Sequence, residues 1–302
     1  MFFVYNFKWN FYNMNNAKPF VKWVGGKTAL LPEIERILPG NINAGVITYV
    51  EPFVGGGAFL FHMLQYHNFK EVIINDLNGP LMDCYSCFQN PKLYVELVAR
   101  VTTLEEQYNR SNDKEKLYYR VRDEYNNIIK QNSLMPMPLL AAYFIFLNKT
   151  CFNGLYRVNK KGEFNVPWGK KTKIKLYDEL SYKDIAASLS KVKICTGDYG
   201  FIKNLKGDDT LIYMDPPYMP EKEQSFTSYT ASGFNLKEQE RLCDICDILT
   251  GNGVKWIQSN SNSSVIKDLY KGYNIKEVTA PRFVSAKADG RGNVQELIIT
   301  NY

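Results

Sequence analysis

The sequence predicts an α/β protein built on a Rossmann-like, mostly parallel sheet, with a mainly helical segment inserted into it. Several short apolar runs stop at acidic, glycine or proline residues, as the buried strands of such sheets do. One of these runs, 46–50, leads through glycines into a helical pattern, which is how a nucleotide-binding βαβ unit begins. From about residue 77 to residue 148 the pattern is helical, with no strand alternation.

Composition is ordinary for a protein with a buried core, since 45% of the 302 residues are hydrophobic and 23% are charged. The longest apolar run, 139–147, is much shorter than the ~20 residues that span a bilayer. The N-terminus has no basic region ahead of a long apolar stretch, so it does not resemble a signal peptide. We therefore expect a cytoplasmic monomer without membrane contact.

The cysteine and histidine patterns do not predict a metal site. Two C-x-x-C pairs, Cys84 with Cys87 and Cys243 with Cys246, are too far apart to form a zinc ribbon. Each pair lies in a helical pattern, where positions i and i+3 share a face, so we expect reduced thiols that pack in the core.

The first part of the chain, 1–16, has no clean period, and we expect an extension that starts at Met1 or Met14. The run 20–28 then enters a Gly-Gly turn followed by a helix from 29 to about 38. It is not a phosphate loop, because valine occupies the position of the first glycine. Within this run Lys27 can reach an anion or a carbonyl and Trp23 can stack; a solvated edge strand is the alternative.

A strand at 46–50 is followed by Glu-Pro-Phe-Val-Gly-Gly-Gly and by a helix at 58–66. The next strand, 71–75, ends at Asp76, which is 19 residues past Gly57 and suits a carboxylate that binds ribose hydroxyls. The turn lacks the full dinucleotide motif and resembles the first motif of enzymes that use S-adenosylmethionine. Its motif positions are Phe53, Gly55 and Gly57.

The basic excess of the chain lies in residues 149–193. This segment holds eleven Lys and Arg against four Asp and Glu, so its net charge is +7 and the other 257 residues sum to −1. A hairpin-like turn at 159–162 separates two stretches that carry Asn, Arg and apolar side chains. Lysines such as Lys160 and Lys161 can neutralise phosphates, while the other side chains can read base edges. The alternative is a solvated basic face.

Two further strand ends carry polar residues. After the strand at 192–196, Asp198 and Tyr199 can pair with and stack on an adenine. After the strand at 210–214 comes Asp215-Pro216-Pro217-Tyr218, a stiff turn of hydrogen-bond acceptors beside an aromatic face. Such a turn suits the amino group of a nucleobase. A loop at 219–234, a helix at 235–250 and strands at 254–258, 273–279, 282–284 and 294–300 complete the prediction, with a basic hairpin tip at 288–293.

Six segments, in this order, resemble the Dam family of DNA adenine methyltransferases: 20–27, 51–57, 75–78, 153–157, 162–167 and 215–218. The resemblance implies a Rossmann-like S-adenosylmethionine-dependent methyltransferase sheet, formed by 17–88 and 190–302. It also implies an inserted, mainly helical DNA-recognition domain at 89–189 that carries a β-hairpin.

The resemblance also implies site residues. Cofactor-contacting positions are Trp23, Lys27, Asp76 and Asp215, and positions that read double-stranded DNA at GATC are Lys22, Asn153, Leu155, Arg157 and Pro167. The implied reaction methylates the amino group of a flipped adenine. Asp215 and the Pro216 carbonyl would accept its N–H bonds, and Tyr218 would stack on the base.

Other classes of protein remain open from the residues alone. A nicotinamide-dependent oxidoreductase would use the glycine turn and Asp76, but it leaves 215–218 and the basic segment unexplained. A non-catalytic DNA-binding protein would keep the basic segment but would need neither Asp76 nor Asp215. Methylation of cytosine or RNA is a closer alternative, although the cytosine variant of the motif has Ser in place of Asp215.

Overall fold

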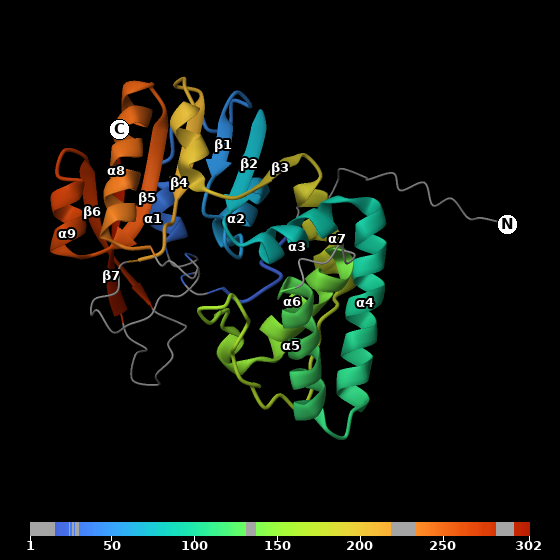
Figure 1. The fold of residues 1–302 in the computed structure, drawn as a ribbon. Coiled ribbons are helices and arrows are strands. Elements are labelled where there is room, and N and C mark those ends of the chain that lie inside the picture. The colour runs from blue at the N-terminus through green and yellow to red at the C-terminus, as the bar shows by residue number, and fades with distance from the viewer. Residues whose placement is uncertain are drawn as a thin grey trace.

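Seven strands form one mixed sheet in the order β3-β2-β1-β4-β5-β7-β6 (Figure 1). β1 pairs in parallel with β2 and β4, whereas β7 is antiparallel to both of its neighbours. The strand order reverses between β1 and β4, and open α/β sheets bind their ligands beside such a reversal. The strands are β1 (Thr48–Glu51), β2 (Glu71–Asp76), β3 (Val192–Thr196), β4 (Thr210–Met214), β5 (Lys255–Ser261), β6 (Asn274–Pro281) and β7 (Asn293–Thr300).

The computed structural model describes residues 16–23, 25, 27, 30–130, 137–218, 234–281 and 293–302. The expected extension, most of the loop that follows Tyr218, the strand at 282–284 and most of the hairpin tip lie outside the described residues.

The predicted helices are present in their predicted order, whereas the helices at 179–189 and 264–269 were not predicted. The helices are α1 (Leu31–Glu35), α2 (Ala58–Tyr66), α3 (Gly79–Gln89), α4 (Pro91–Arg110), α5 (Lys114–Lys130), α6 (Met137–Thr150), α7 (Glu179–Leu189), α8 (Leu236–Gly251) and α9 (Ser264–Leu269), with short 3-10 turns η1 (Phe152–Gly154) and η2 (Tyr199–Asn204).

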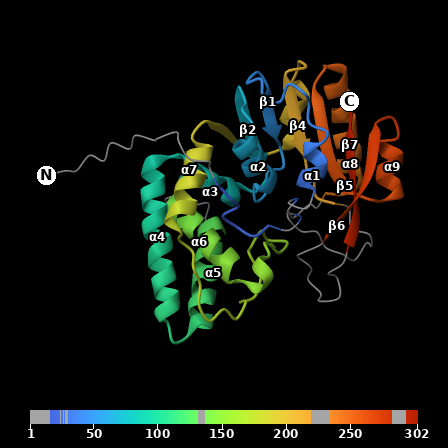
Figure 2. The same cartoon turned by 180° about the vertical axis from the view of Figure 1, so that it is seen from behind.

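Both faces of the central strands are buried, which explains their continuous apolar runs. Along β4, Leu211 and Tyr213 pack into the core cluster of one face, while Ile212 and Met214 pack into that of the other. Helix α8 lies over one face of the sheet, and α1 and α2 lie over the opposite face (Figure 2).

Helix α1 is shorter than the sequence predicts. It covers five residues, whereas the pattern predicted a helix from 29 to about 38. Pro32 suits the first turn because it needs no intrahelical donor. Pro39 disfavours the helical conformation at Leu38, so the chain turns away after Arg36.

The helices predicted between residues 77 and 148 are present, and α4, α5 and α6 lie together beneath the sheet (Figure 1). One hydrophobic core cluster runs from β1 and β2 through α3 into α4, α5 and α6. The predicted domain boundary between residues 88 and 89 therefore falls within the last turn of α3, a helix that shares this core with α4.

The hairpin-like turn predicted at 159–162 is present, and a single bridge flanks it in place of paired regular strands. Val158 and Phe164 form an isolated antiparallel bridge, and the Gly162 amide donates to the Asn159 carbonyl at 2.9 Å. Gly162 has a φ of +76°, a left-handed conformation that glycine adopts without steric cost.

The cysteine interpretation is confirmed, since Cys84, Cys87, Cys243 and Cys246 are buried and free. In the described part of the chain, no group of three or more His, Cys, Asp and Glu side chains is arranged to hold a metal ion. Among the described helices, none is long and apolar enough to cross a membrane.

Candidate active site

Four acidic residues lie where strands of the parallel part of the sheet end. Glu51 is the last residue of β1, Asp76 is the last residue of β2, Asp215 follows β4, and Asp198 follows β3 after one glycine. Because parallel strands end at the same edge, these side chains surround the point where the strand order reverses. Neighbouring carboxyl groups disfavour ionisation, and burial holds the pKa of Glu51 well above its usual range.

Asp215 is held by two donors. Its Oδ1 accepts from the Ser259 hydroxyl at 2.9 Å and from the Lys27 ammonium group at 3.2 Å. Burial raises the pKa of Asp215 to about 6, although Lys27 and Ser259 act in the opposite direction. The carboxyl is therefore mostly ionised at neutral pH but titrates close to it.

The two prolines after Asp215 belong to a turn that is anchored from within the protein. The Pro217 carbonyl accepts from the Gln239 amide at 3.2 Å, and Gln239 in turn accepts from the Asn260 amide at 3.0 Å. Within the described ranges, the Pro216 carbonyl accepts no hydrogen bond.

Tyr218 is fixed by two groups that are distant in sequence. Its hydroxyl donates to Glu296 Oε2 at 2.7 Å, and the Lys27 ammonium lies 4.2 Å from the centre of its ring. Lys27 also forms an ion pair with Glu296 at 3.3 Å. Sequence reasoning missed Glu296 and Ser259. The available signal was weak: Glu296 is the lone charged residue in the apolar run of β7.

Asp76 binds the glycine turn that follows β1. Its Oδ2 accepts from the Gly55 amide at 3.0 Å, and its Oδ1 accepts from the Asn78 amide at 2.9 Å. Burial raises the pKa of Asp76, and these backbone donors oppose the rise. Each carboxylate oxygen has a second lone pair for a ligand hydroxyl.

The glycines of this turn make room for the protein's own aromatic side chains. A Cβ added at Gly55 would lie 2.8 Å from the Trp23 indole, and one at Gly57 would lie 2.5 Å from the Tyr85 hydroxyl. Both glycines have left-handed backbones, with φ of +49° and +76°. Trp23 also stacks on Tyr156, with ring centroids 5.5 Å apart.

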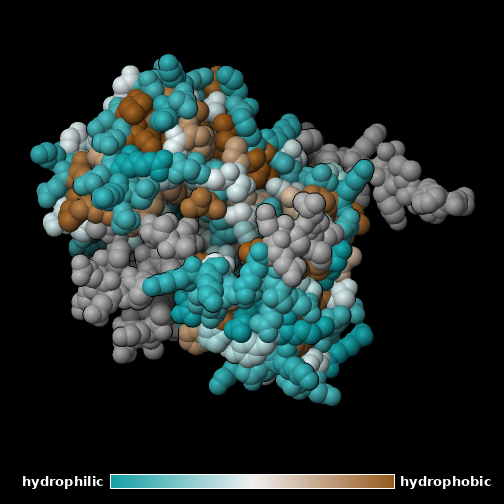
Figure 3. All heavy atoms as spheres, in the orientation of Figure 1, coloured by the Kyte–Doolittle hydropathy of each residue, from teal (hydrophilic) through white to brown (hydrophobic). Residues whose placement is uncertain are grey.

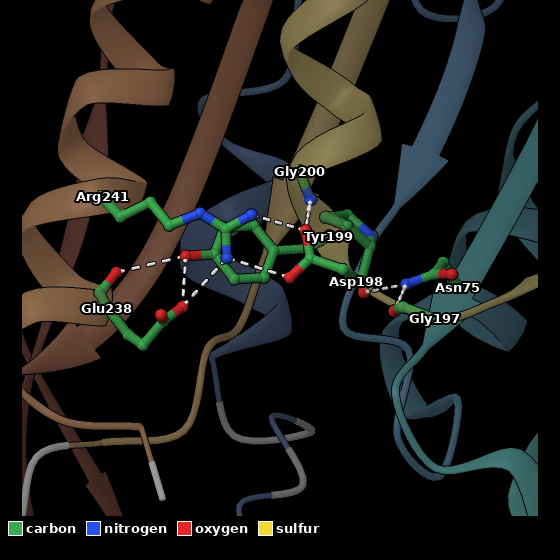
Figure 4. Close-up of polar contacts among 8 residues, drawn as sticks. Asn75, Gly197, Asp198, Tyr199, Gly200, Glu238 and Arg241 are labelled. Carbon is green, nitrogen blue, oxygen red and sulfur yellow. Dashed lines mark hydrogen bonds and ion pairs between the residues drawn. The ribbon is translucent and has the colours of Figure 1, made fainter. Parts of the chain in front are cut away.

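Asp198 and Tyr199 belong to a polar group just after β3 (Figure 4). The Arg241 guanidinium donates to both Asp198 oxygens, and these hydrogen bonds lower the pKa of Asp198. The Tyr199 hydroxyl donates to Glu238 at 2.9 Å. The ring of Phe53 lies 4.9 Å from that of Tyr199, which places two aromatic faces beside the end of β1.

The sequence-predicted DNA contacts fall into two groups. The first lies around η1, where the Lys22 backbone exchanges two hydrogen bonds with the Asn148 side chain, each of 2.8 Å. The Lys22 side chain covers Gly154, so that a Cβ there would lie 2.6 Å from it. Asn153 is exposed with a φ of +55°, and Leu155 is half-buried.

The second group lies on the hairpin-like segment. Arg157 is exposed, and its guanidinium donates to the Asn165 side chain at 2.7 Å and to the Asn165 carbonyl at 3.3 Å. Lys160, Lys161 and Pro167 are also exposed. The visible surface of the helical part beneath the sheet is predominantly hydrophilic (Figure 3). The structure thus brings Lys27, Asp215 and Tyr218 into direct contact, whereas Arg157 and the lysines of the turn are solvent-facing.

A mixed seven-stranded sheet in this order, with acids at its strand ends, is consistent with a Rossmann-like methyltransferase. The model of D12 class N6 adenine-specific DNA methyltransferases matches residues 23–283, and the chain belongs to this family.

Three relatives match almost the whole chain. A type II methyltransferase, M.MjaIII, from Methanocaldococcus jannaschii is 45% identical over 95% of this chain and 99% of its own length. Another type II methyltransferase, M1.LlaDCHI, from Lactococcus lactis is 37% identical over 96% and 97% of the two chains. A DNA adenine methylase from Vibrio cholerae is 31% identical over 94% and 96%.

Proposed function

We propose that the protein transfers a methyl group from S-adenosylmethionine to the exocyclic amino group of an adenine flipped out of double-stranded DNA, within GATC. The observation that carries this proposal is the pair of acceptors at the end of β4, the Asp215 carboxylate and the Pro216 carbonyl. The exocyclic amino group of adenine carries two N–H donors, one for each of these acceptors.

The acceptors have a chemical role as well as a binding role. The lone pair of an adenine amino nitrogen is delocalised into the ring, so the nitrogen is a weak nucleophile. Hydrogen bonds to Asp215 and Pro216 draw it towards tetrahedral geometry and stabilise the positive charge that develops on it. Ser259 and Lys27 hold the Asp215 carboxylate, so little reorganisation is needed when the base arrives.

The residues at these strand ends fit S-adenosylmethionine, which supplies the electrophilic methyl group. Asp76 retains lone pairs for two ribose hydroxyls while backbone amides hold its carboxylate in place. Phe53 and Tyr199 provide apolar faces for an adenine ring, with Asp198 as an acceptor beside them. Trp23 and Lys27 lie at the glycine turn and at the catalytic turn, respectively.

We assign the DNA contacts to the mainly helical segment at 89–189 and to its hairpin-like turn. A base inside a duplex cannot reach Asp215, so the target must leave the stack, and Tyr218 offers it a fixed aromatic face. Arg157 suits a guanine and the lysines of the turn suit phosphates. The GATC sequence rests on the likeness of this segment to the Dam family, and one relative is named a DNA adenine methylase.

The test is the transfer of tritium from labelled S-adenosylmethionine to a GATC duplex, followed by identification of the modified base. We expect N6-methyladenine from the wild-type protein and none from Asp215→Ala, whose folding is checked by circular dichroism. Asp209→Ala is the matched control, because Asp209 is a half-exposed acid just before the same strand. Label in cytosine, or no label in the duplex, would refute the proposal, as would near-wild-type turnover by Asp215→Ala.

A further inference from the structure

Three side chains from distant segments meet behind the catalytic turn. Lys27 Nζ lies 3.2 Å from Asp215 Oδ1 and 3.3 Å from Glu296 Oε2, so one ammonium group bridges two carboxylates. The Tyr218 hydroxyl donates to the same oxygen of Glu296 at 2.7 Å. The side chain of Lys27 is 5% exposed, and those of Asp215 and Glu296 are 22% and 15% exposed. Contacts this well shielded are only weakly screened by salt.

Among the residues that the structure describes, this cluster carries an uncompensated charge. Two carboxylates face one ammonium group, which leaves one net negative charge. Ser259 adds only a neutral donor, and the phenols of Tyr218 and Tyr213 stay neutral because burial holds their pKa values well above the usual range.

The excess charge faces the place where a cationic group must arrive, if the protein has the function proposed above. A methyl group that is transferred to the nitrogen held by Asp215 must approach it to about 3–3.5 Å. The sulfonium centre that carries this methyl group is then within roughly 8 Å of the cluster. S-adenosylhomocysteine, the product, has a neutral thioether at the same position.

We propose that Glu296 is a specificity-determining residue, whose charge makes the site favour the sulfonium cofactor over its neutral product. Asp215 and Lys27 alone would form a neutral pair, so Glu296 supplies the excess charge. Because Lys27 lies between Asp215 and Glu296, the Glu296 charge is roughly 8–14 Å from the sulfonium centre. With an effective dielectric constant of about 20, one charge at this distance changes affinity by a factor of about 7 to 30. Since solvent reaches part of the site, we expect about tenfold. Loss of the sulfonium charge on transfer then also favours product release.

Calorimetric binding of S-adenosylmethionine and S-adenosylhomocysteine, without DNA, tests this inference. Glu296→Gln removes the charge but keeps an acceptor for Tyr218 and Lys27. Glu296→Ala also removes the charge and serves as a second neutral variant, in case glutamine itself disturbs the site. Glu296→Asp keeps the negative charge. Glu277→Gln is the matched control, because Glu277 is an exposed carboxylate on the neighbouring strand β6, paired with Lys267. Thermal melting establishes that each variant is folded.

We expect Glu296→Gln and Glu296→Ala to lower the ratio of the two affinities about tenfold in favour of the product, while Glu296→Asp and Glu277→Gln preserve it. A merely structural role for Glu296 would change both affinities by a common factor, and that result would overturn the inference. Failure of the wild-type protein to bind either compound would instead refute the proposed function, and this inference with it. The two failures are therefore distinct.

Discussion

Two requirements oppose each other at Asp215. Burial disfavours the ionised carboxylate, whereas the proposed hydrogen bond from an amino group needs it. Burial is the largest influence and raises its pKa to about 6, above the ordinary value of 3.8. Lys27 and Ser259 lower this pKa and Glu296 raises it. The protonation state of one residue is thus set by groups on three other segments of the chain.

The rate of methyl transfer should consequently depend on pH between 5 and 7. The ionised form is active, so the rate should rise with pH through about 6 and level off above about 7. Glu296→Gln removes a charge that raises the Asp215 pKa and should move the midpoint to lower pH. Single-turnover rates with saturating cofactor and DNA measure this midpoint, with Glu277→Gln as the control. A rate that stays level down to pH 5, or a midpoint that Glu296→Gln leaves in place, would contradict this assignment.

For Arg157, a base-reading role and a phosphate-binding role predict different methylation rates on altered DNA sites. Asn165 holds its guanidinium at the exposed surface, which suits a bidentate contact with guanine. We expect Arg157→Ala to raise methylation of sites altered at one GC pair relative to GATC, by about 1–3 kcal/mol of lost discrimination. Lys160→Ala and Lys161→Ala should weaken binding to all DNA alike and flatten its salt dependence.

The measurement is the methylation rate on GATC and on each single-base variant at fixed salt. If Arg157→Ala reduces every rate by one common factor, Arg157 contacts only phosphate.

At the scale of elements, the turn between β1 and α2 shows how packing constrains a candidate binding loop. Gly57 is the N-cap of α2 in a left-handed conformation. Its missing side chain leaves space for the Tyr85 hydroxyl, which donates to the Gly55 carbonyl at 3.0 Å. The loop is thus held in shape by α3 before any ligand binds.

Gly57→Ala should destabilise the protein by about 2 kcal/mol or more. A left-handed conformation costs a residue with a Cβ about 1–2 kcal/mol, and the added atom would also displace Tyr85. Urea unfolding measures the loss. Gly251→Ala is the control, because Gly251 is exposed at the end of α8 and a Cβ there meets no atom within 4 Å. It should leave stability unchanged or raise it by up to about 1 kcal/mol. Equal effects of the two substitutions would refute the packing argument.

At the scale of the whole molecule, the sheet and the helices beneath it share one hydrophobic core. The cluster contains Tyr49 of β1, Phe88 of α3, Val101 of α4 and Phe146 of α6. Phe88 also packs edge-on against Tyr182 of α7, with centroids 4.9 Å apart. Segments on both sides of residue 88 thus bury the same apolar surface.

The protein should therefore unfold in one cooperative transition. Segments that share a core lose each other's packing when either one opens, so neither is stable alone. Hydrogen exchange under native conditions, followed by mass spectrometry, should give the same maximal protection for peptides of β4 and of α6. Circular dichroism and tryptophan fluorescence should report coincident melting. Earlier exchange throughout 89–189 would show instead that this segment is an independent domain.

Local patterns in the sequence determined most of the elements and the turn at 215–218. The apolar runs of β2 and β4, the limits of α2 and the Asp-Pro-Pro-Tyr turn depend on neighbours along the chain, where spacing and conformational preference act directly. The helix predicted at 29–38 is shorter in the structure. Leu38 precedes a proline and therefore disfavours the helical conformation, which outweighs the helical pattern.

Tertiary structure alone decided which side chains surround Asp215. Lys27 and Glu296 meet although 269 residues separate them, because the antiparallel strand β7 inserts between β5 and β6 and brings its carboxylate to the end of β4. Ser259 reaches Asp215 for a similar reason, since β5 pairs with β4. No local spacing encodes these contacts. They depend on strand order, which follows from how the whole chain buries its apolar surface, and this order sets the charge and the pKa of the site.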